Sequence, residues 1–268
     1  MGLRSALHQA GAGALSKLLA FPPPDGERRQ VPCTCGGVAR YHEQRPKQIL
    51  TVMGRATVTR PYYLCPQCHE GQFPADAELD IVDTEFSPGV RRMQAIVGQD
   101  APFDRGRVQM NLLAGLEVTT KSVERVAEAI GTDIAQREQR AIVRAVLLDL
   151  PILVGEPVPI LYIQMDGTGV PVVKKETLGR KGKNEGQPAH TREVKLGCVF
   201  TQTKWDENGY AIRDPDSTTY IGAIETAEAF GKRLYLEAWN RGWSRAHKKV
   251  VIGDGAEWIW NDADAHFP

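Results

Sequence analysis

The 268-residue sequence predicts a multidomain α+β and α/β protein. Two close cysteine pairs flank a strand-like segment near the N-terminus. Apolar residues then recur at helical spacing, and the last third alternates apolar strand-like runs with a helix. We therefore expect an N-terminal helix with a proline-rich linker, a small β module, a helical region and a mixed-sheet domain. Their expected bounds are 1–29, 30–75, 76–152 and 153–268.

The composition is that of an ordinary soluble globular protein, with 42% hydrophobic and 25% charged residues. We expect no membrane span, because no stretch of eighteen apolar residues occurs. The alanine-rich segment Leu3–Phe21 carries charged and polar residues, so we interpret it as an amphipathic helix rather than a signal peptide. The expected location is the cytoplasm, where paired thiols favour metal binding over disulfide formation.

The cysteine pairs predict a zinc ribbon at residues 30–75. Cys33 and Cys35 form the first pair, Cys65 and Cys68 form the second, and 29 residues separate Cys35 from Cys65. This pattern suits a tetrahedral zinc site with each pair on a tight turn. Between the pairs, residues 48–60 are typical of two short strands with a turn near Gly54. His69 is an alternative ligand, but four cysteines suffice.

The zero net charge gives no overall argument for DNA binding, but the charges are unevenly distributed. Between residues 28 and 60 there are seven basic residues and one acid, whereas residues 71–90 contain five acids and no base. A cationic patch on the zinc module favours phosphate binding, although ordinary solvated surface charge is the alternative. The candidate DNA contacts here are Arg40, Arg45, Lys47, Arg55 and Arg60.

The helical region begins at Ser87, a suitable N-cap that is followed by Pro88 at the first helical position. A second helix is expected over about 104–114 and a third over 122–131, separated by a turn at Gly115. This pattern is typical of a helix-turn-helix, and a plain helical linker is the alternative. Residues 134–150 continue as a charged helix.

The final domain begins after a proline-rich boundary at 153–159. Residues 160–165 predict a buried strand, and residues 169–173 are a candidate hairpin partner. Further strands are expected at 193–201, 217–224 and 248–253, with helices at 226–242 and from 256 onward.

Asp166 and Asp254 are the candidate catalytic residues of this domain. Each follows a strand-like run and precedes a glycine. Functional side chains of open α/β sheets gather at the carboxyl ends of strands, and carboxylate oxygens suit Mg²⁺. Two such ions would support phosphodiester chemistry. For either aspartate alone, an ordinary Asp-Gly turn is the alternative.

A basic, glycine-rich loop at 174–195 separates two of the expected strands. Its cations are candidates for holding DNA phosphates near the metal site, which would position DNA without reading its sequence. They are Lys174, Lys175, Arg180, Lys181 and Lys183. We interpret His190 as a surface histidine and Cys198 as a buried small apolar residue.

Five segments together resemble the DDE-type insertion-sequence transposases of the ISKra-type group. They extend from about residue 30 to the end of the chain, and their order and spacing are more specific than any one motif. The segments are Cys33–Gly37, Thr51–Cys68, Ser87–Arg92, Met165–Pro171 and Val251–Trp260.

This resemblance implies an RNase H-like catalytic domain with Asp166 as first and Asp254 as second catalytic carboxylate. It also implies Mg²⁺ or Mn²⁺ as catalytic cofactor, structural Zn²⁺, and double-stranded DNA with the element's terminal repeats as partner. The active form would be a homo-oligomer. The family pattern also needs a Glu well beyond the second Asp, whereas only fourteen residues follow Asp254. We therefore expect a truncated RNase H-like domain that is inactive alone and exposes apolar surface near Trp258, Trp260 and Phe267.

Two alternatives remain. The first is a non-catalytic zinc-ribbon DNA-binding protein that acts as a repressor or an accessory subunit. The second is another metal-dependent nuclease. In the second case Glu257 or Asp264 would complete the site.

Overall fold

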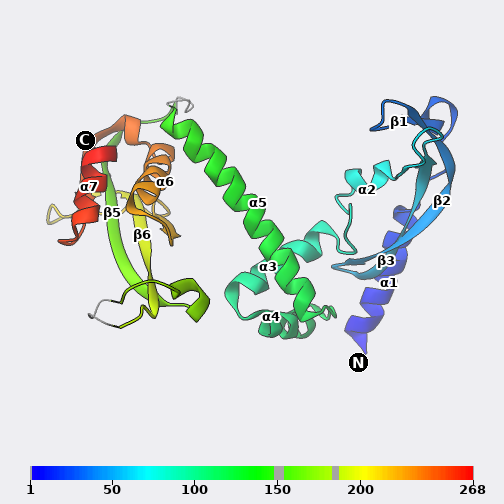
Figure 1. Ribbon diagram of the computed structural model, residues 1–268, viewed down its shortest axis with the longest axis horizontal. Coiled ribbons are helices and arrows are strands. Elements are labelled where there is room, and N and C mark those ends of the chain that lie inside the picture. Colours follow the sequence, from blue (N-terminus) through cyan, green and yellow to red (C-terminus); the bar gives the residue numbers. More distant parts are fainter. Residues whose placement is uncertain (1, 148–153, 183–186, 268) are drawn as a thin grey trace. The chain divides into compact units, whose positions relative to one another are not determined.

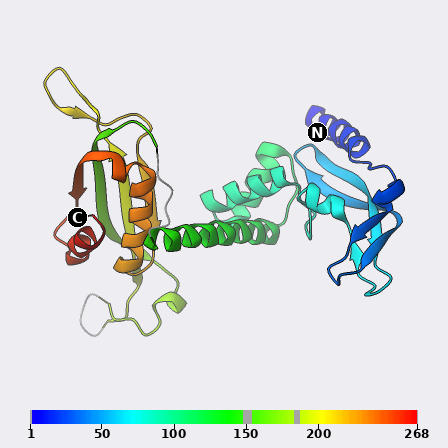
Figure 2. The same cartoon turned by 90° about the horizontal axis from the view of Figure 1, so that it is seen from above.

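The computed structural model describes residues 2–147, 154–182 and 187–267 and has a mixed α+β architecture. The chain divides into two compact units, Met1–Ala135 and Gln136–Pro268, and each is described separately below. The order of elements along the chain is shown in Figures 1 and 2. Among the helices that the structure describes, none has the length and apolar character that crossing a bilayer requires.

An antiparallel four-stranded sheet with the order β1-β2-β3-β4 forms the centre of the first unit. The expected turn at Gly54 is present, and this residue has the φ of +100° that glycine adopts readily. The hairpin is longer than expected, because β2 and β3 pair from Thr51–Gly54 back to Arg40–Leu64 with a bulge near Tyr41. The strands are β1 (Gln30–Pro32), β2 (Val38–Thr51), β3 (Gly54–Leu64) and β4 (Gly71–Gln72).

Helices pack around this sheet. Ile49, Val58 and Ile81 form a core cluster with partly buried residues of the N-terminal segment, and Leu50, Phe86 and other residues form a second cluster with the central helices. The helices are α1 (Leu3–Leu18), η1 (Gly26–Arg29), α2 (Pro74–Glu78), α3 (Pro88–Asp100), α4 (Phe103–Gln109), the π-helical turn η2 (Met110–Ala114) and the first part of α5 (Thr120–Val146), which continues past Ala135 into the second unit.

The helical region differs from expectation in its continuity. Ser87 caps α3 by accepting a hydrogen bond from the Val90 N–H at 3.4 Å, as expected. The segments expected to begin at residues 122 and 134 instead belong to the single helix α5. The helix continues through Gly131, because this glycine does not have a positive φ. Gly115, with φ +66°, ends the preceding turn.

The second unit has a mixed sheet with the order β10-β5-β6-β9, in which β10 is parallel to β5 and the other pairs are antiparallel. The expected hairpin partner at 169–173 is wrong. Gly167 and Gly169 stay extended, so β5 continues to Pro171 and pairs with β6 instead. The strands are β5 (Val158–Pro171), β6 (Thr191–Thr201), β7 (Lys204–Trp205), β8 (Ala211–Ile212), β9 (Thr219–Ala223) and β10 (Ala246–Ile252), with η3 at Lys174–Thr177.

Helices α6 (Ala227–Asn240) and α7 (Glu257–His266) pack on one face of this sheet, with η4 (Trp243–Arg245) between them in sequence. Leu161, Ile163 and Met165 point into this core as alternate residues of β5. The expected exposure near the end of the chain is partly wrong. Phe267 is buried against Trp243 and Trp258 packs on the core, whereas Trp260 is 44% exposed.

Candidate metal centre and carboxylate pair

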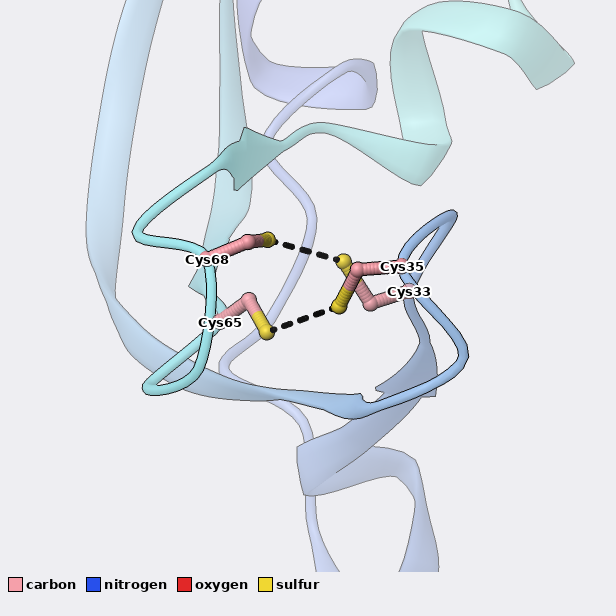
Figure 3. A group of neighbouring side chains, drawn as sticks. All are labelled: Cys33, Cys35, Cys65 and Cys68. Carbon is pink, nitrogen blue, oxygen red and sulfur yellow. Dashed lines mark hydrogen bonds between the residues drawn. The ribbon is translucent and has the colours of Figure 1, made fainter.

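Four cysteines converge at one end of the first sheet. Cys33 and Cys35 lie in the turn between β1 and β2, and Cys65 and Cys68 lie in the turn between β3 and β4. Their sulfur atoms all lie within 4.8 Å of one another. Figure 3 shows the two pairs of side chains pointing toward each other. The Cys33–Cys68 and Cys35–Cys65 sulfur distances are 3.6 and 3.7 Å. The strand pairing of β2 with β3 therefore brings together residues that are 30 or more positions apart.

The two turns have similar backbone hydrogen bonds. In the first, the Cys33 N–H donates to the Gly37 carbonyl at 2.9 Å, and Gly36 has φ +83°. In the second, the Cys65 N–H donates to the Glu70 carbonyl at 3.0 Å, and His69 has φ +58°. His69 does not belong to the sulfur cluster, so the expectation of four cysteine ligands is the one the geometry favours.

The thiols influence one another's ionisation. A backbone N–H of Cys35 lowers the pKa of Cys33 to about 6 against the opposing effect of burial. The Glu70 N–H lowers the pKa of Cys68, but burial and the neighbouring thiols together raise it to about 12. The backbone N–H of Cys68 also lowers the pKa of Cys65. Ionisation of all four thiols in so small a space needs a cation to neutralise them.

The cluster fits zinc in donor type and in size. Four thiolates are a common ligand set of structural zinc sites, with metal–sulfur distances of about 2.3 Å. A regular tetrahedron of that radius has edges of about 3.8 Å, close to the 3.6 and 3.7 Å sulfur separations. The residues present can therefore hold a metal such as zinc.

The second candidate site contains Asp166, on β5, and Asp254, in the loop that follows β10. The parallel pairing of β10 with β5 ends at Ile252 and Gln164, and each aspartate follows two residues beyond its member of that last pair. Asp166 was expected at a strand end, but it lies within β5 opposite Leu196 of β6. The expectation failed because its glycine neighbours resemble a turn in sequence.

Each aspartate has one oxygen that accepts a local backbone hydrogen bond. Asp166 Oδ1 accepts from the Gly167 N–H at 2.7 Å, and Asp254 Oδ1 accepts from the Ala256 N–H at 2.8 Å. The indole N–H of Trp260 donates to the Asp254 carbonyl at 2.8 Å, which fixes the start of α7 against this loop. Both carboxylates are exposed and retain a second oxygen for an ion or substrate.

No third ligand joins this pair in the described part of the chain, where the four cysteines are the only group of three or more metal-binding residues. Glu257 begins α7, and Asp264 is exposed further along the same helix. Asp262 is buried, has an unpaired Oδ2, and has a pKa that desolvation raises to about 6. The hypothesis that Glu257 or Asp264 completes the site is not supported by this geometry.

The predicted DNA contacts of the first unit divide into two groups. Arg40, Arg45 and Arg55 are exposed, although Arg45 and Arg55 pair with Glu43 and Glu85. The expectation for Arg60 is wrong, because its side chain is 7% exposed and forms a two-point ion pair with Asp76. Lys47 donates to the same carboxylate at 3.1 Å, so it too has a structural partner. The acidic segment thus neutralises part of the cationic patch.

In the second unit, Lys174 and Lys175 lie on η3 and are exposed. Arg180 and Lys181 follow in the exposed loop, and Lys183 lies outside the described residues. Sequence reasoning missed Arg213 and Tyr220, which line a pocket beside Asp166. No motif marks them, because they come from separate segments.

No protein family model matches this chain, and no curated protein matches it.

Proposed function

We propose that this chain is a DNA transposase of the DDE type that acts on an insertion sequence. The observation that supports the proposal is the parallel pairing of β5 with β10, because its last pair, Gln164 and Ile252, lies two residues before Asp166 and Asp254. A mixed sheet with helices on one face supports the RNase H-like assignment. The four-cysteine cluster supports a zinc ribbon as the accompanying DNA-binding or protein-binding module.

Asp166 and Asp254 would hold Mg²⁺ or Mn²⁺ through their free oxygens. The bound ion would activate a water or a 3′-hydroxyl for attack on a phosphodiester and stabilise the leaving oxygen. The remaining ligand positions would be filled by water, by the DNA phosphate or by a further carboxylate. Exposed Lys174, Lys175 and Lys181 would hold the DNA backbone, and the active complex would be a homo-oligomer on paired terminal repeats.

The test is cleavage and joining of duplex DNA that ends in the element's terminal repeat, with Mg²⁺ or Mn²⁺. The chain is assayed as it stands and extended through the reading frame that follows it. Asp166→Asn and Asp254→Asn should each lower activity at least about 100-fold, because several kcal/mol of charge stabilisation are lost. Glu207→Gln, at an exposed acid between β7 and β8, is the matched control. Activity that survives both aspartate changes, or no activity in either form, contradicts the proposal.

A non-catalytic DNA-binding protein, a repressor or an accessory subunit, is the second candidate. It is favoured by the contrast between the complete four-thiol cluster and the carboxylate pair that lacks a third partner among the described residues. In that case zinc-dependent duplex binding would occur without cleavage in either form. Binding would then weaken when the exposed Arg40 and Arg55 are changed to Ala.

A further inference from the structure

The face of the second sheet opposite α6 and α7 carries a row of side chains that the catalytic proposal does not use. Gln164 of β5 pairs with Cys198 of β6, and Cys198 pairs with Tyr220 of β9. Directly paired residues point to the same face, so these three side chains form one row across the sheet. Asp166 and Leu196 form the next row, and there β9 contributes Gly222, which has no side chain.

These rows enclose a pocket of about 240 Å³. Tyr220 is 75% exposed at its rim, and Asp166 forms part of its wall. The volume is enough for one planar heterocycle. The lining side chains include Gln164, Asp166, Leu196, Cys198, Arg213 and Tyr220, and Gly197 and Ile221 complete the lining.

Arg213 is the only cation among these lining residues, and its position is well defined. Its guanidinium lies 3.8 Å from the centre of the Phe200 ring. The next residue, Asp214, accepts hydrogen bonds from the hydroxyls of Thr201 and Thr203, both at 2.7 Å. Within the described part of the chain, no carboxylate lies in ion-pair range of Arg213, so its charge is available to an anion.

The pocket therefore combines an exposed aromatic ring, a side-chain amide and an unpaired guanidinium. Proteins that bind single-stranded nucleic acid use this combination, with bases stacked on aromatic rings and phosphates held by cations. A base within a duplex is already stacked and paired and cannot enter such a pocket unless it leaves the helix. A free anion alone would not explain the aromatic rim.

We propose that this pocket, here called the Tyr220 pocket, holds one unpaired nucleotide of a DNA strand beside Asp166. The base would stack on Tyr220 and meet the Gln164 amide, and Arg213 would hold a flanking phosphate. The inference rests on the proposed function, because it assigns a nucleotide subsite to the same strand-cleaving site.

The experiment measures binding of the full chain to a labelled single strand and to its duplex by fluorescence anisotropy, in EDTA-free buffer with Ca²⁺. Tyr220→Ala should weaken single-strand binding about 5- to 150-fold, the range that corresponds to about 1–3 kcal/mol of base stacking. Duplex binding should change less than about two-fold. Tyr210→Ala, at a tyrosine 72% exposed outside the pocket, is the control and should leave both affinities unchanged.

A second arm locates the base. A set of single strands is used, each with one abasic position at a different place. At one of these positions, Tyr220→Ala should cause no further loss of affinity, because the base that stacks on Tyr220 is already missing. Tyr220→Phe should restore binding, and Arg213→Gln should weaken it at every position. Equal losses in Tyr220→Ala and Tyr210→Ala, or additive losses at all positions, would overturn the proposal. Absence of strand cleavage with intact single-strand binding would contradict the transposase proposal but leave the pocket standing.

Discussion

The buried ion pair beneath β2 and β3 gives a prediction whose size follows from the structure. Arg60 Nε donates to Asp76 Oδ1 at 2.6 Å and Nη2 donates to Oδ2 at 3.2 Å, while Lys47 Nζ lies 3.1 Å from the same carboxylate. The Arg60 and Asp76 side chains are 7% and 9% exposed. Asp76→Ala would leave the guanidinium buried without its counter-ion. Removing one partner of such a pair costs about 3–5 kcal/mol.

Arg60 cannot easily avoid this cost by moving into water. Its guanidinium also lies 4.0 Å from the centre of the Phe73 ring and donates to the Arg45 carbonyl at 2.9 Å. The predicted loss of about 3–5 kcal/mol therefore lowers the free energy needed to open the whole β2–β3 hairpin.

Hydrogen exchange of the zinc-loaded full chain, measured by mass spectrometry, reports this opening separately from the second unit. A loss of about 3 kcal/mol speeds exchange of the protected amides in residues 38–64 by about 100-fold or more. The control is Glu85→Ala, whose partner Arg55 lies 3.7 Å away with both side chains more than half exposed. This pair should contribute less than about 1 kcal/mol. Equal acceleration in the two variants, or less than about five-fold in Asp76→Ala, would refute the reasoning.

The ion pair also predicts a pH dependence. Burial raises the pKa of Asp76, but the hydrogen bonds and charges of Arg60 and Lys47 outweigh burial and lower it overall. Because the pKa in the folded state lies below that of the unfolded chain, the contribution is present at neutral pH and is lost as the pH falls through the folded-state value. Asp76→Asn should therefore narrow the difference in hairpin protection between neutral and acidic pH.

Three further changes test other parts of the structure. Cys65→Ser should abolish stoichiometric zinc binding and the hydrogen-exchange protection of the β2–β3 hairpin. Unfolding of the second unit should stay unchanged; tryptophan fluorescence reports on this unit alone, because all five tryptophans lie within residues 205–260. Burial raises the pKa of Asp262 to about 6, so the stability contribution of this carboxyl group is present at low pH and is lost as the pH rises. The difference in free energy of unfolding between Asp262→Asn and the native chain, measured with urea, should therefore change by about 2 kcal/mol between pH 4.5 and 7.5. A difference that stays constant over this range would contradict the prediction. Phe230→Ala, at a fully buried core position, should destabilise the second unit by about 3–5 kcal/mol, whereas Tyr210→Ala should change its stability by less than about 0.5 kcal/mol.

Some features followed from local sequence because their causes are local. The cysteine pairs predicted a four-thiol cluster, since each pair lies on its own short turn and the intervening strands bring the turns together. Ser87 with Pro88 predicted the start of α3, because an N-cap depends on residues three positions apart. The apolar run at residues 160–165 predicted a buried strand, which lies within β5.

Other features depended on contacts between distant segments. Glycine is equally compatible with a turn and with an extended strand, so the pairing with β6, not the local sequence, decided that Asp166 lies within β5. The sequence predicted Arg60 as a surface DNA contact, but in the folded chain Arg60 donates a hydrogen bond to Asp76, sixteen positions later. The Tyr220 pocket exists because strand register aligns residues from β5, β6 and β9, and register is fixed by burial of the opposite face against α6 and α7. The sequence by itself therefore determined the metal-binding turns, the start of α3 and the position of the β5 core strand. Tertiary packing decided which side chains share a site, because register and burial, rather than neighbours in the chain, set a side chain's neighbours in space.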